Sequence, residues 1–206
     1  EIVLTGIHIA SYGKDLGKNT LLDVIRSVHN AEGIKRIRLS SIEPTIMTEA
    51  FVEELSKLEK VCPHFHLSLQ SGCDETLKRM NRKYTTDEYR RVVHRLRKIW
   101  PDVSITTDIM VGFPGETEEE FEETYAFVEK IGFSKIHVFQ YSARTGTPAA
   151  SFENQVSAEC KEKRSRRLIE LGHKMEQSFM RSFEGRCVTV LFEEEHPDLD
   201  GYYEGY

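Results

Sequence analysis

The chain has 206 residues, of which 39% are hydrophobic and 30% are charged, and its formal net charge is −6. These values are typical of a soluble globular protein with a hydrophobic core. No apolar run is long enough to span a bilayer as a helix. The negative charge disfavours broad, nonspecific binding of nucleic acids.

The four cysteines stand far apart, at positions 62, 73, 160 and 187, and none of them belongs to a CxxC or CxxxCxxC group. This spacing disfavours a zinc knuckle and a local cluster-binding loop, because both need closely spaced thiolates. Scattered cysteines indicate a reducing compartment, so we expect a cytoplasmic protein. The first residue is Glu1, no signal-peptide pattern precedes it, and a strand-like run begins at once. We therefore expect a piece of a longer protein.

Hydrophobic periodicity divides the chain into alternating strands and helices. Strands are expected at residues 2–9, 36–41, 65–70, 104–111 and 135–141. Amphipathic helices are expected at residues 21–31, 48–58, 74–80, 86–100 and 118–131. The alternation predicts parallel strands with right-handed crossovers, in a doubly wound sheet or a barrel. A long helix at residues 158–183 then leads to an expected strand at residues 186–193, the first of a new unit that stops at residue 206 before it can close.

Ligands in parallel α/β folds gather at the carboxyl ends of the strands. The segments that follow the expected strands are rich in glycine, proline, hydroxyl, amide and charged groups, at residues 11–13, 41–44, 70–74, 112–117 and 142–148. Because all five loops would point to one rim, we expect a polar small-molecule site there.

The segment from Gly112 to Thr117, Gly-Phe-Pro-Gly-Glu-Thr, joins an expected strand to an expected helix. Its glycines permit positive φ, and Thr117 with Glu120 forms a capping box. Backbone N–H groups at such a junction can meet a ligand, although many α/β proteins use the same turn only to change direction. Phosphate is disfavoured, because acidic residues at positions 116 and 118–120 occupy the favourable end of the helix dipole.

The sequence contains no recognisable catalytic triad and no assignable general acid or base. His64 and His66 alternate with apolar residues, so we expect them to face one side of a strand in a structural or rim role rather than as metal ligands. Basic residues cluster at positions 78–83, 90–98 and 161–167. These clusters are either solvated helix faces or an RNA-facing surface.

Five motifs occur in order along the chain: LTGIHIASYG at residues 4–13, RLSSIEP at 38–44, HLSLQSGC at 66–73, MNRKY at 80–84 and DIMVGFPGET at 108–117. Together they resemble the radical S-adenosylmethionine (SAM) methylthiotransferases, from residue 1 to about residue 183. The Thr-Gly-Ile-His form of the first motif resembles the MtaB branch, which modifies N6-threonylcarbamoyladenosine next to the tRNA anticodon. Two alternatives stay open: the MiaB branch, which acts on isopentenyladenosine and typically carries Gly-Gln-Asn there, and the RimO branch, which acts on a ribosomal protein.

The resemblance implies an α/β fold, a partial (β/α) TIM-like barrel of about five strand–helix units at residues 1–183. A truncated, small β-rich TRAM domain would begin at residues 184–206. The implied full-length protein holds SAM and [4Fe–4S] clusters, uses an electron donor, and acts on tRNA by radical transfer of a methylthio group to an adenine carbon.

Motif position also implies cofactor-binding residues. Gly6 and His8 match the segment that meets the SAM amino group. Ser68 and Gln70 match the strand on the ribose side. Arg82 suits the SAM carboxylate, because a guanidinium pairs with it bidentately.

Further candidates lie on the later strands. Ile109 and Gly112 match the segment packed against adenine, and Phe139 and Tyr141 belong to the strand whose backbone reads the adenine edge. Glu43, at the end of the second expected strand, completes the cofactor-binding set. No catalytic residue and no metal ligand is assigned.

The chain departs from the family pattern because it contains no CxxxCxxC loop. We therefore expect that this chain alone neither binds the radical SAM cluster nor turns over.

Residues 2–9 would form an unprotected sheet edge, so self-association is also expected. Two rival classes remain: another α/β enzyme with a phosphate-bearing substrate on the glycine turn, and a noncatalytic RNA-binding module that uses the basic helices.

Overall fold

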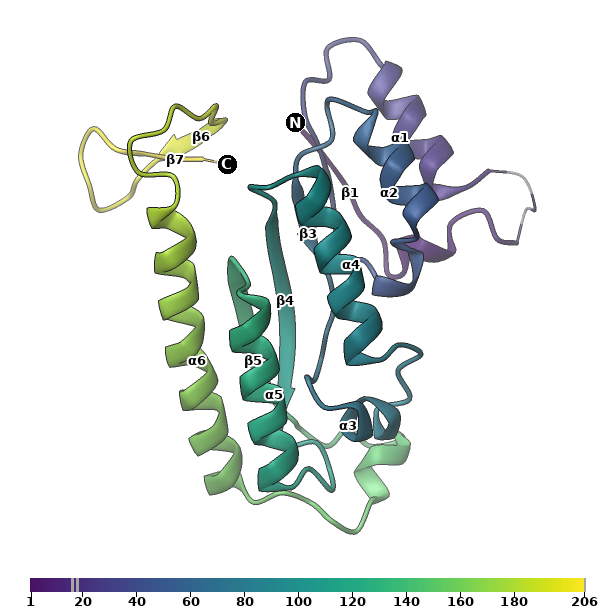
Figure 1. Ribbon diagram of the computed structural model, residues 1–206, viewed down its shortest axis with the longest axis vertical. Coiled ribbons are helices and arrows are strands. Elements are labelled where there is room, and N and C mark those ends of the chain that lie inside the picture. The colour runs from purple at the N-terminus through teal and green to yellow at the C-terminus, as the bar shows by residue number, and fades with distance from the viewer. Residues whose placement is uncertain (16, 18, 206) are drawn as a thin grey trace.

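Parallel strands form the centre of the molecule in a computed structural model that describes residues 1–15, 17 and 19–205 (Figure 1). Two parallel sheets contain β1 (Ile2–Leu4) with β2 (Ile37–Leu39), and β3 (His64–His66) with β4 (Ser104–Val111) and β5 (Lys135–Gln140). Backbone bridges from Ile37 to Val61 and from Ile42 to Leu67 connect the two sheets. The strands therefore follow one another in chain order around a partial barrel, which confirms the expected parallel α/β fold.

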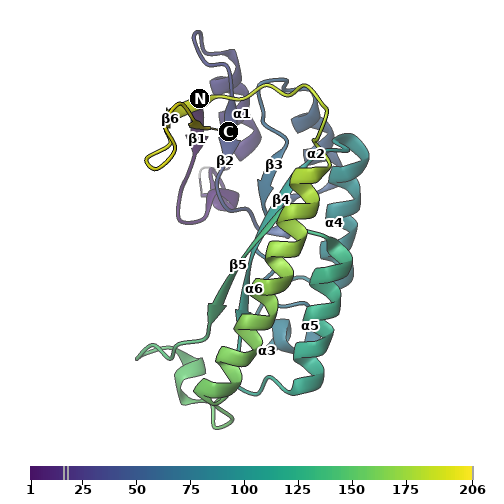
Figure 2. The same cartoon turned by 90° about the vertical axis from the view of Figure 1, so that its left-hand side faces the viewer.

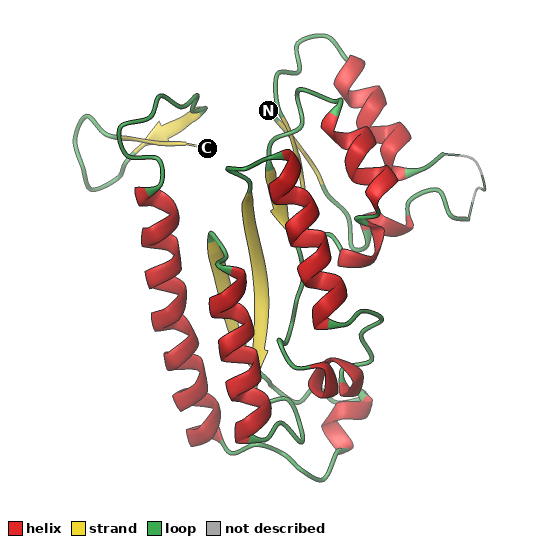
Figure 3. Cartoon of the chain, viewed as in Figure 1, coloured by secondary structure: helices red, strands yellow, loops and turns green. Residues whose placement is uncertain are grey.

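The strands alternate with helices, as Figure 3 shows. The α-helices are α1 (Leu21–Asn30), α2 (Glu49–Ser56), α3 (Asp74–Arg79), α4 (Thr86–Ile99), α5 (Glu118–Ile131) and α6 (Ala158–Arg181). Short 3₁₀ helices follow three strands: η1 (Ile9–Ser11), η2 (Pro44–Ile46) and η3 (Pro148–Ser151). In Figure 2, α4, α5 and α6 lie on one side of β4 and β5. Among the described residues, no helix is both long and apolar enough to cross a membrane.

Side-chain caps fix where several helices begin. Capping boxes open α1 at Thr20, α4 at Thr85 and α5 at Thr117, each with an acidic residue three positions later that bonds back to the cap. Such caps contribute about 1 kcal/mol each, because they satisfy N–H groups that a helix leaves unpaired. Gly132 ends α5 in the left-handed conformation, at φ 65°.

The strands have two unlike faces. Phe65, Ile109 and Val111 have no exposed surface and lie in the core with α4 and α5. The residues between them point to the opposite side, because side chains alternate along a strand. We call this opposite side the inner face, and it carries Arg38, His64, His66, Thr106, Asp108, Met110, His137 and Phe139.

Four of the five expected strands are shorter than expected: β2 covers only Ile37–Leu39, β5 ends one residue early at Gln140, and β1 and β3 differ most. The strand expected at residues 2–9 ends at Leu4, and η1 occupies the end of that segment. The strand expected at residues 65–70 is regular only over His64–His66. Beyond it, Gln70 takes φ 70°, although its N–H donates to Asp108 O at 2.9 Å and its carbonyl accepts from Met110 N at 2.8 Å. Irregular backbone therefore continues the pairing without a regular strand.

The C-terminal prediction was wrong in its boundaries. The expected strand at residues 186–193 is instead β6 (Phe192–Glu195), and β7 (Tyr203–Gly205) pairs with it antiparallel. Within the described residues these two strands form a hairpin, because antiparallel strands need only a short connection. Residue 206 lies outside the part that the structure describes.

Candidate functional site

The loops after β1 and β2 bring two predicted cofactor residues together. His8 Nε2 lies 3.3 Å from Glu43 Oε2, and both side chains are partly exposed. Gly6 lies in the same loop as His8 and is exposed. The first two strand ends thus present an accessible pair of hydrogen-bonding groups at the rim.

Tyr84 anchors the next part of the rim. Its hydroxyl donates to Ser68 O at 2.8 Å and to Leu69 O at 3.0 Å. Burial raises the pKa of Tyr84 to about 12, and Arg82 and Glu43 are near enough to act on it electrostatically. Tyr84 therefore gathers the predicted residues Glu43, Ser68 and Arg82 into one neighbourhood, a role that the sequence prediction missed.

Arg82 has unused hydrogen-bonding capacity. Its Nε is buried and has no hydrogen-bond partner within the described part of the chain. Such a group is costly to leave unpaired, about 1–3 kcal/mol or more when charged. Gln70, whose backbone holds the strained left-handed conformation, lies two residues beyond Ser68. Strain of this kind concentrates at functional sites.

A pocket of about 510 Å³ lies at the carboxyl ends of β4 and β5. Its walls include Met110, Phe113, Phe139, Tyr141 and Arg144. Phe139 is 53% exposed, which is unusual for so large an apolar residue. The Tyr141 hydroxyl is buried without a hydrogen-bond partner in the described residues. Apolar walls with a few unused polar atoms are typical of a small-molecule site.

Ile109 does not contribute its side chain to this pocket. The Ile109 side chain is fully buried on the helix-covered face of β4. Met110, its neighbour, lies on the inner face and lines the pocket. The strict alternation of β4 could have identified Met110 from the sequence, but the motif position drew attention to Ile109.

Three backbone N–H groups of the glycine turn form hydrogen bonds within the chain. Gly112 N donates to Glu116 Oε2 at 2.7 Å, Gly115 N to Asn154 O at 2.7 Å, and Thr117 N to Glu120 Oε2 at 3.1 Å. Of the two interpretations of this turn, the structure favours the one in which it changes the direction of the chain, because these three N–H groups are bonded within the chain. The acidic partners also make the turn a poor seat for phosphate.

Helix α6 fixes the two strand ends that line the pocket. Lys161 Nζ donates to Tyr141 O at 2.9 Å. Arg164 pairs with Glu116 at 2.7 Å, and Glu116 in turn holds the Gly112 N–H. The sequence prediction missed both contacts, because the partners lie 20 and 48 residues apart.

The four cysteines do not gather. Cys62 and Cys73 are buried, Cys160 is half-buried and Cys187 is exposed. Burial raises the pKa of both the Cys62 and the Cys73 thiols, which disfavours the thiolate that binds metals. Among the residues that the structure describes, no three His, Cys, Asp or Glu side chains are arranged to hold a metal ion.

The basic clusters bond mainly within the chain. Arg79 pairs with Glu120, Arg97 donates to Ile131 O at 2.7 Å and to Gly132 O at 2.6 Å, and Arg167 pairs with Glu122 at 2.5 Å. These contacts fasten helices to one another. They favour the interpretation of the clusters as structural helix faces over an RNA-binding module.

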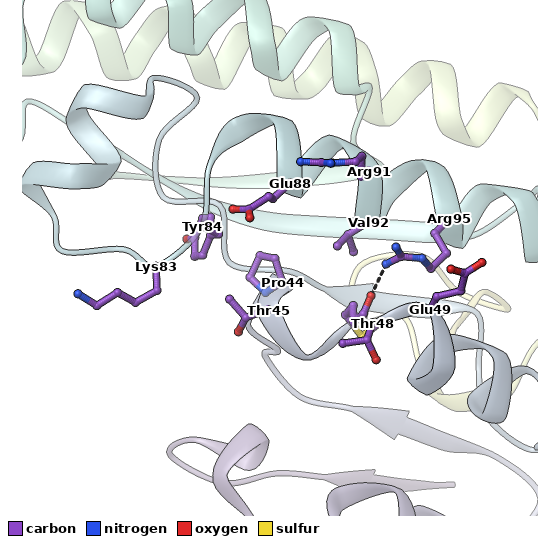
Figure 4. Close-up of a pocket in the computed structure, with 11 residues that line it drawn as sticks. Pro44, Thr45, Thr48, Glu49, Lys83, Tyr84, Glu88, Arg91, Val92 and Arg95 are labelled. Carbon is purple, nitrogen blue, oxygen red and sulfur yellow. Dashed lines mark hydrogen bonds between the residues drawn. The ribbon is translucent and has the colours of Figure 1, made fainter.

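A second hollow, of about 420 Å³, separates η2 and the start of α2 from α4 (Figure 4). Pro44, Tyr84 and Val92 contribute to its lining, and Arg95 spans it to donate to Met47 O at 2.5 Å. This arginine ties α4 to the loop after β2. The hollow adjoins the rim through Tyr84 but contains none of the predicted cofactor residues.

The curated proteins to which this chain is similar are named for the transfer of methylthio groups to tRNA. The chain is 41% identical over 213 residues to the threonylcarbamoyladenosine tRNA methylthiotransferase MtaB of Bacillus subtilis. This alignment covers 100% of this chain and 47% of that protein. The chain is 42% identical over 194 residues to the tRNA-2-methylthio-N(6)-dimethylallyladenosine synthase of Clostridium botulinum, covering 94% and 43%. The MtaB of Thermotoga maritima is 42% identical over 193 residues, covering 94% and 44%. The chain therefore spans less than half the length of these relatives.

Solved structures share the fold at low sequence identity. Coproporphyrinogen III oxidase HemN of Escherichia coli matches with a TM-score of 0.58 at 19% identity, over 68% of this chain and 32% of that one. The methyltransferase TsrM of Kitasatospora setae matches with a TM-score of 0.56 at 18% identity, over 72% and 29%. Both are radical SAM proteins, and the model of the Radical SAM superfamily matches residues 2–128. With its parallel strands, its polar rim and this match over more than half its length, the chain belongs to the radical SAM superfamily.

Proposed function

We propose that this chain is the SAM-binding core of a radical SAM tRNA methylthiotransferase. The observation that carries the proposal is the 41% identity to an MtaB protein along the whole chain. A similar identity, 42%, relates the chain to dimethylallyladenosine synthases, so identity does not separate the two substrates. We infer N6-threonylcarbamoyladenosine as the substrate from the Thr-Gly-Ile-His form of residues 5–8.

The rim and the pocket suit SAM. Met110 and Phe139 offer apolar walls for an adenine ring, next to the buried Tyr141 hydroxyl. The Arg82 guanidinium, whose Nε has no hydrogen-bond partner among the described residues, suits a carboxylate. The His8–Glu43 pair offers partners for an amino group. When bound, SAM and its cluster supply the radical chemistry that activates the substrate carbon.

This chain would orient SAM rather than perform the bond chemistry. Ser68, held by Tyr84, and the strained Gln70 would fix the ribose side of the cofactor. The α6 contacts through Lys161 and Arg164 would keep the pocket walls in place. Such preorganisation is how a protein contributes to reactions whose chemistry belongs to a cofactor.

The four cysteines that this chain contains do not suit a [4Fe–4S] cluster. Cluster ligation takes three or four thiolates at one place, whereas these thiols are dispersed and the two buried ones have raised pKa values. We therefore propose that this chain by itself neither assembles the cluster nor turns over. Anaerobic reconstitution with iron and sulfide tests this, and a stoichiometric [4Fe–4S] absorbance and EPR signal would contradict it.

The function is tested by mass spectrometry of tRNA nucleosides after deletion and restoration of the full-length gene. Loss and recovery of methylthio-threonylcarbamoyladenosine would support the proposal. Loss of the methylthio-isopentenyl nucleoside alone would assign the other adenosine. If every methylthio nucleoside persisted, tRNA would be excluded, and a ribosomal protein would become the substrate to test. The proposal also includes a cytoplasmic location. It includes a separate electron donor as well, because cluster-dependent SAM cleavage is reductive.

A further inference from the structure

The inner face of the sheet is polar directly below the pocket. Met110 pairs with Phe139 across β4 and β5, and both line the pocket. Two residues earlier on each strand, Asp108 pairs with His137. Two residues along a strand span about 6.6 Å, so Asp108 and His137 form the next layer of the same face.

His66 connects this layer to β3. Its Nδ1 lies 2.9 Å from Thr106 Oγ1, and its Nε2 lies 3.3 Å from Asp108 Oδ2. The His66 and His137 ring centroids are 6.1 Å apart. His64 stands two residues before His66 on the same face of β3. Two imidazoles, His66 and His137, therefore lie beside the Asp108 carboxylate below the pocket, and His64 extends this histidine row along β3, opposite Ser104.

This cluster has hydrogen-bonding capacity that the described residues do not use. His64 Nδ1 and His66 Nε2 are both buried without a hydrogen-bond partner, since the contact to Asp108 lies outside hydrogen-bond geometry. A buried polar atom without a hydrogen-bond partner is unfavourable, so a ligand that pairs with it gains affinity. The interior of a closed TIM barrel is normally packed with branched apolar side chains. An open, histidine-bearing inner face is instead suited to a polar ligand.

We infer that His64, His66 and His137 form a subsite for the polar N6 substituent of the substrate adenosine. This inference rests on the proposed function. A threonylcarbamoyl group carries urea N–H and C=O groups and a carboxylate, which match imidazole donors and acceptors. An apolar isopentenyl group would leave the imidazole nitrogens unpaired, and sites built to hydrogen-bond a substrate reject analogues that lack the polar groups. The histidines would thus select threonylcarbamoyladenosine.

The test uses the full-length, cluster-loaded enzyme and two anticodon stem-loop RNAs, one with threonylcarbamoyladenosine and one with isopentenyladenosine. The measured quantity is the ratio of kcat/KM for the two RNAs. His64→Phe and His137→Phe keep an aromatic ring but remove its nitrogens. Each variant is expected to lower the ratio about tenfold, the effect of one hydrogen bond to a charged or polar partner. His173→Phe, on the exposed surface of α6, is the matched control and should leave the ratio unchanged.

His137→Gln is a second variant, because its amide restores a donor and an acceptor on an exposed strand. A ratio between those of the wild type and His137→Phe is expected. Unchanged ratios in both phenylalanine variants, or equal losses in His173→Phe, would overturn the subsite. A wild-type enzyme that modifies only the isopentenyl RNA would refute the proposed substrate itself, whatever the variants do.

Discussion

Glu116 and Arg164 form an ion pair of 2.7 Å whose side chains are only 1% and 4% exposed. The same carboxylate accepts the Gly112 N–H at 2.7 Å. Burial raises the pKa of Glu116, against the opposing effects of the Gly112 N–H and the Arg164 charge. This one carboxylate therefore connects the turn after β4 to α6, on which the shape of the pocket depends.

Removal of the Arg164 side chain should destabilise the fold strongly. Arg164→Met leaves the buried Glu116 carboxylate without its cation, so the free energy of unfolding should fall by about 3–5 kcal/mol. Arg166→Met is the control, because Arg166 forms an exposed pair with Glu162 and should cost no more than about 1 kcal/mol. Chemical denaturation measures both. Adding Glu116→Gln to Arg164→Met should recover part of the loss, and equal costs for the two arginines would contradict the prediction.

Gly112 should tolerate no side chain. Its φ is +71°, and a Cβ there would lie 2.1 Å from Lys161 Cγ. Gly132, also left-handed at φ +65°, has open space around it. Gly132→Ala should therefore cost about 1 kcal/mol from backbone strain alone, and Gly112→Ala about 2–4 kcal/mol from strain and overpacking. The measurement is the shift in denaturation midpoint.

Lys161 provides the check on this explanation. Lys161→Ala removes the clashing atoms, so it should relieve part of the cost of Gly112→Ala in the double variant, after correction for the lost bond to Tyr141 O. Strictly additive costs would show that the contact with Lys161 is not the cause.

The elements that were predicted accurately have strong local signals. Helix α5 begins after a capping box and spans Glu118–Ile131 as expected, and β4 spans the expected Ser104–Val111. Their boundaries depend on neighbouring residues, which a sequence displays directly. The glycine turn was likewise placed correctly, although its N–H groups proved to be occupied from within the chain.

The site was less predictable, because its geometry depends on distant contacts. The Tyr84 hydroxyl meets Ser68 and Leu69 across 16 and 15 residues, and no periodicity reveals such a bond. The sequence suggested a structural or rim role for His64 and His66, but the unused nitrogens became visible only once β4 and β5 were placed beside β3. Motif resemblance pointed to the segment that contains Ile109, whose side chain lies in the core, whereas the neighbouring Met110 lines the pocket.

Asp108 should titrate below the usual range of a carboxyl. The interaction with His66 and then the charges of His66 and His137 lower the pKa of Asp108. A lowered pKa stabilises the folded state above the unfolded pKa, and this contribution is lost as the pH falls through the folded value. Carbon-13 NMR of labelled aspartate measures the midpoint. His66→Gln should raise it towards the ordinary value, His94→Gln on the exposed side of α4 should not, and an unmoved midpoint in His66→Gln would refute the assignment.

Met110 and Ile109 are neighbours with opposite expected effects, and they separate cofactor binding from stability. Ile109 is fully buried in the core, so Ile109→Ala should lower the free energy of unfolding by about 2–5 kcal/mol. Met110 lines the pocket instead, so Met110→Ala in the full-length enzyme should raise KM for SAM several-fold while unfolding changes by less than in Ile109→Ala. Thermal denaturation and SAM-dependent kinetics measure the two effects. If Ile109→Ala alone raised KM and Met110→Ala did not, the adenine wall would lie on the other side of β4, because the alternation of the strand allows only one of the two side chains to face the cofactor.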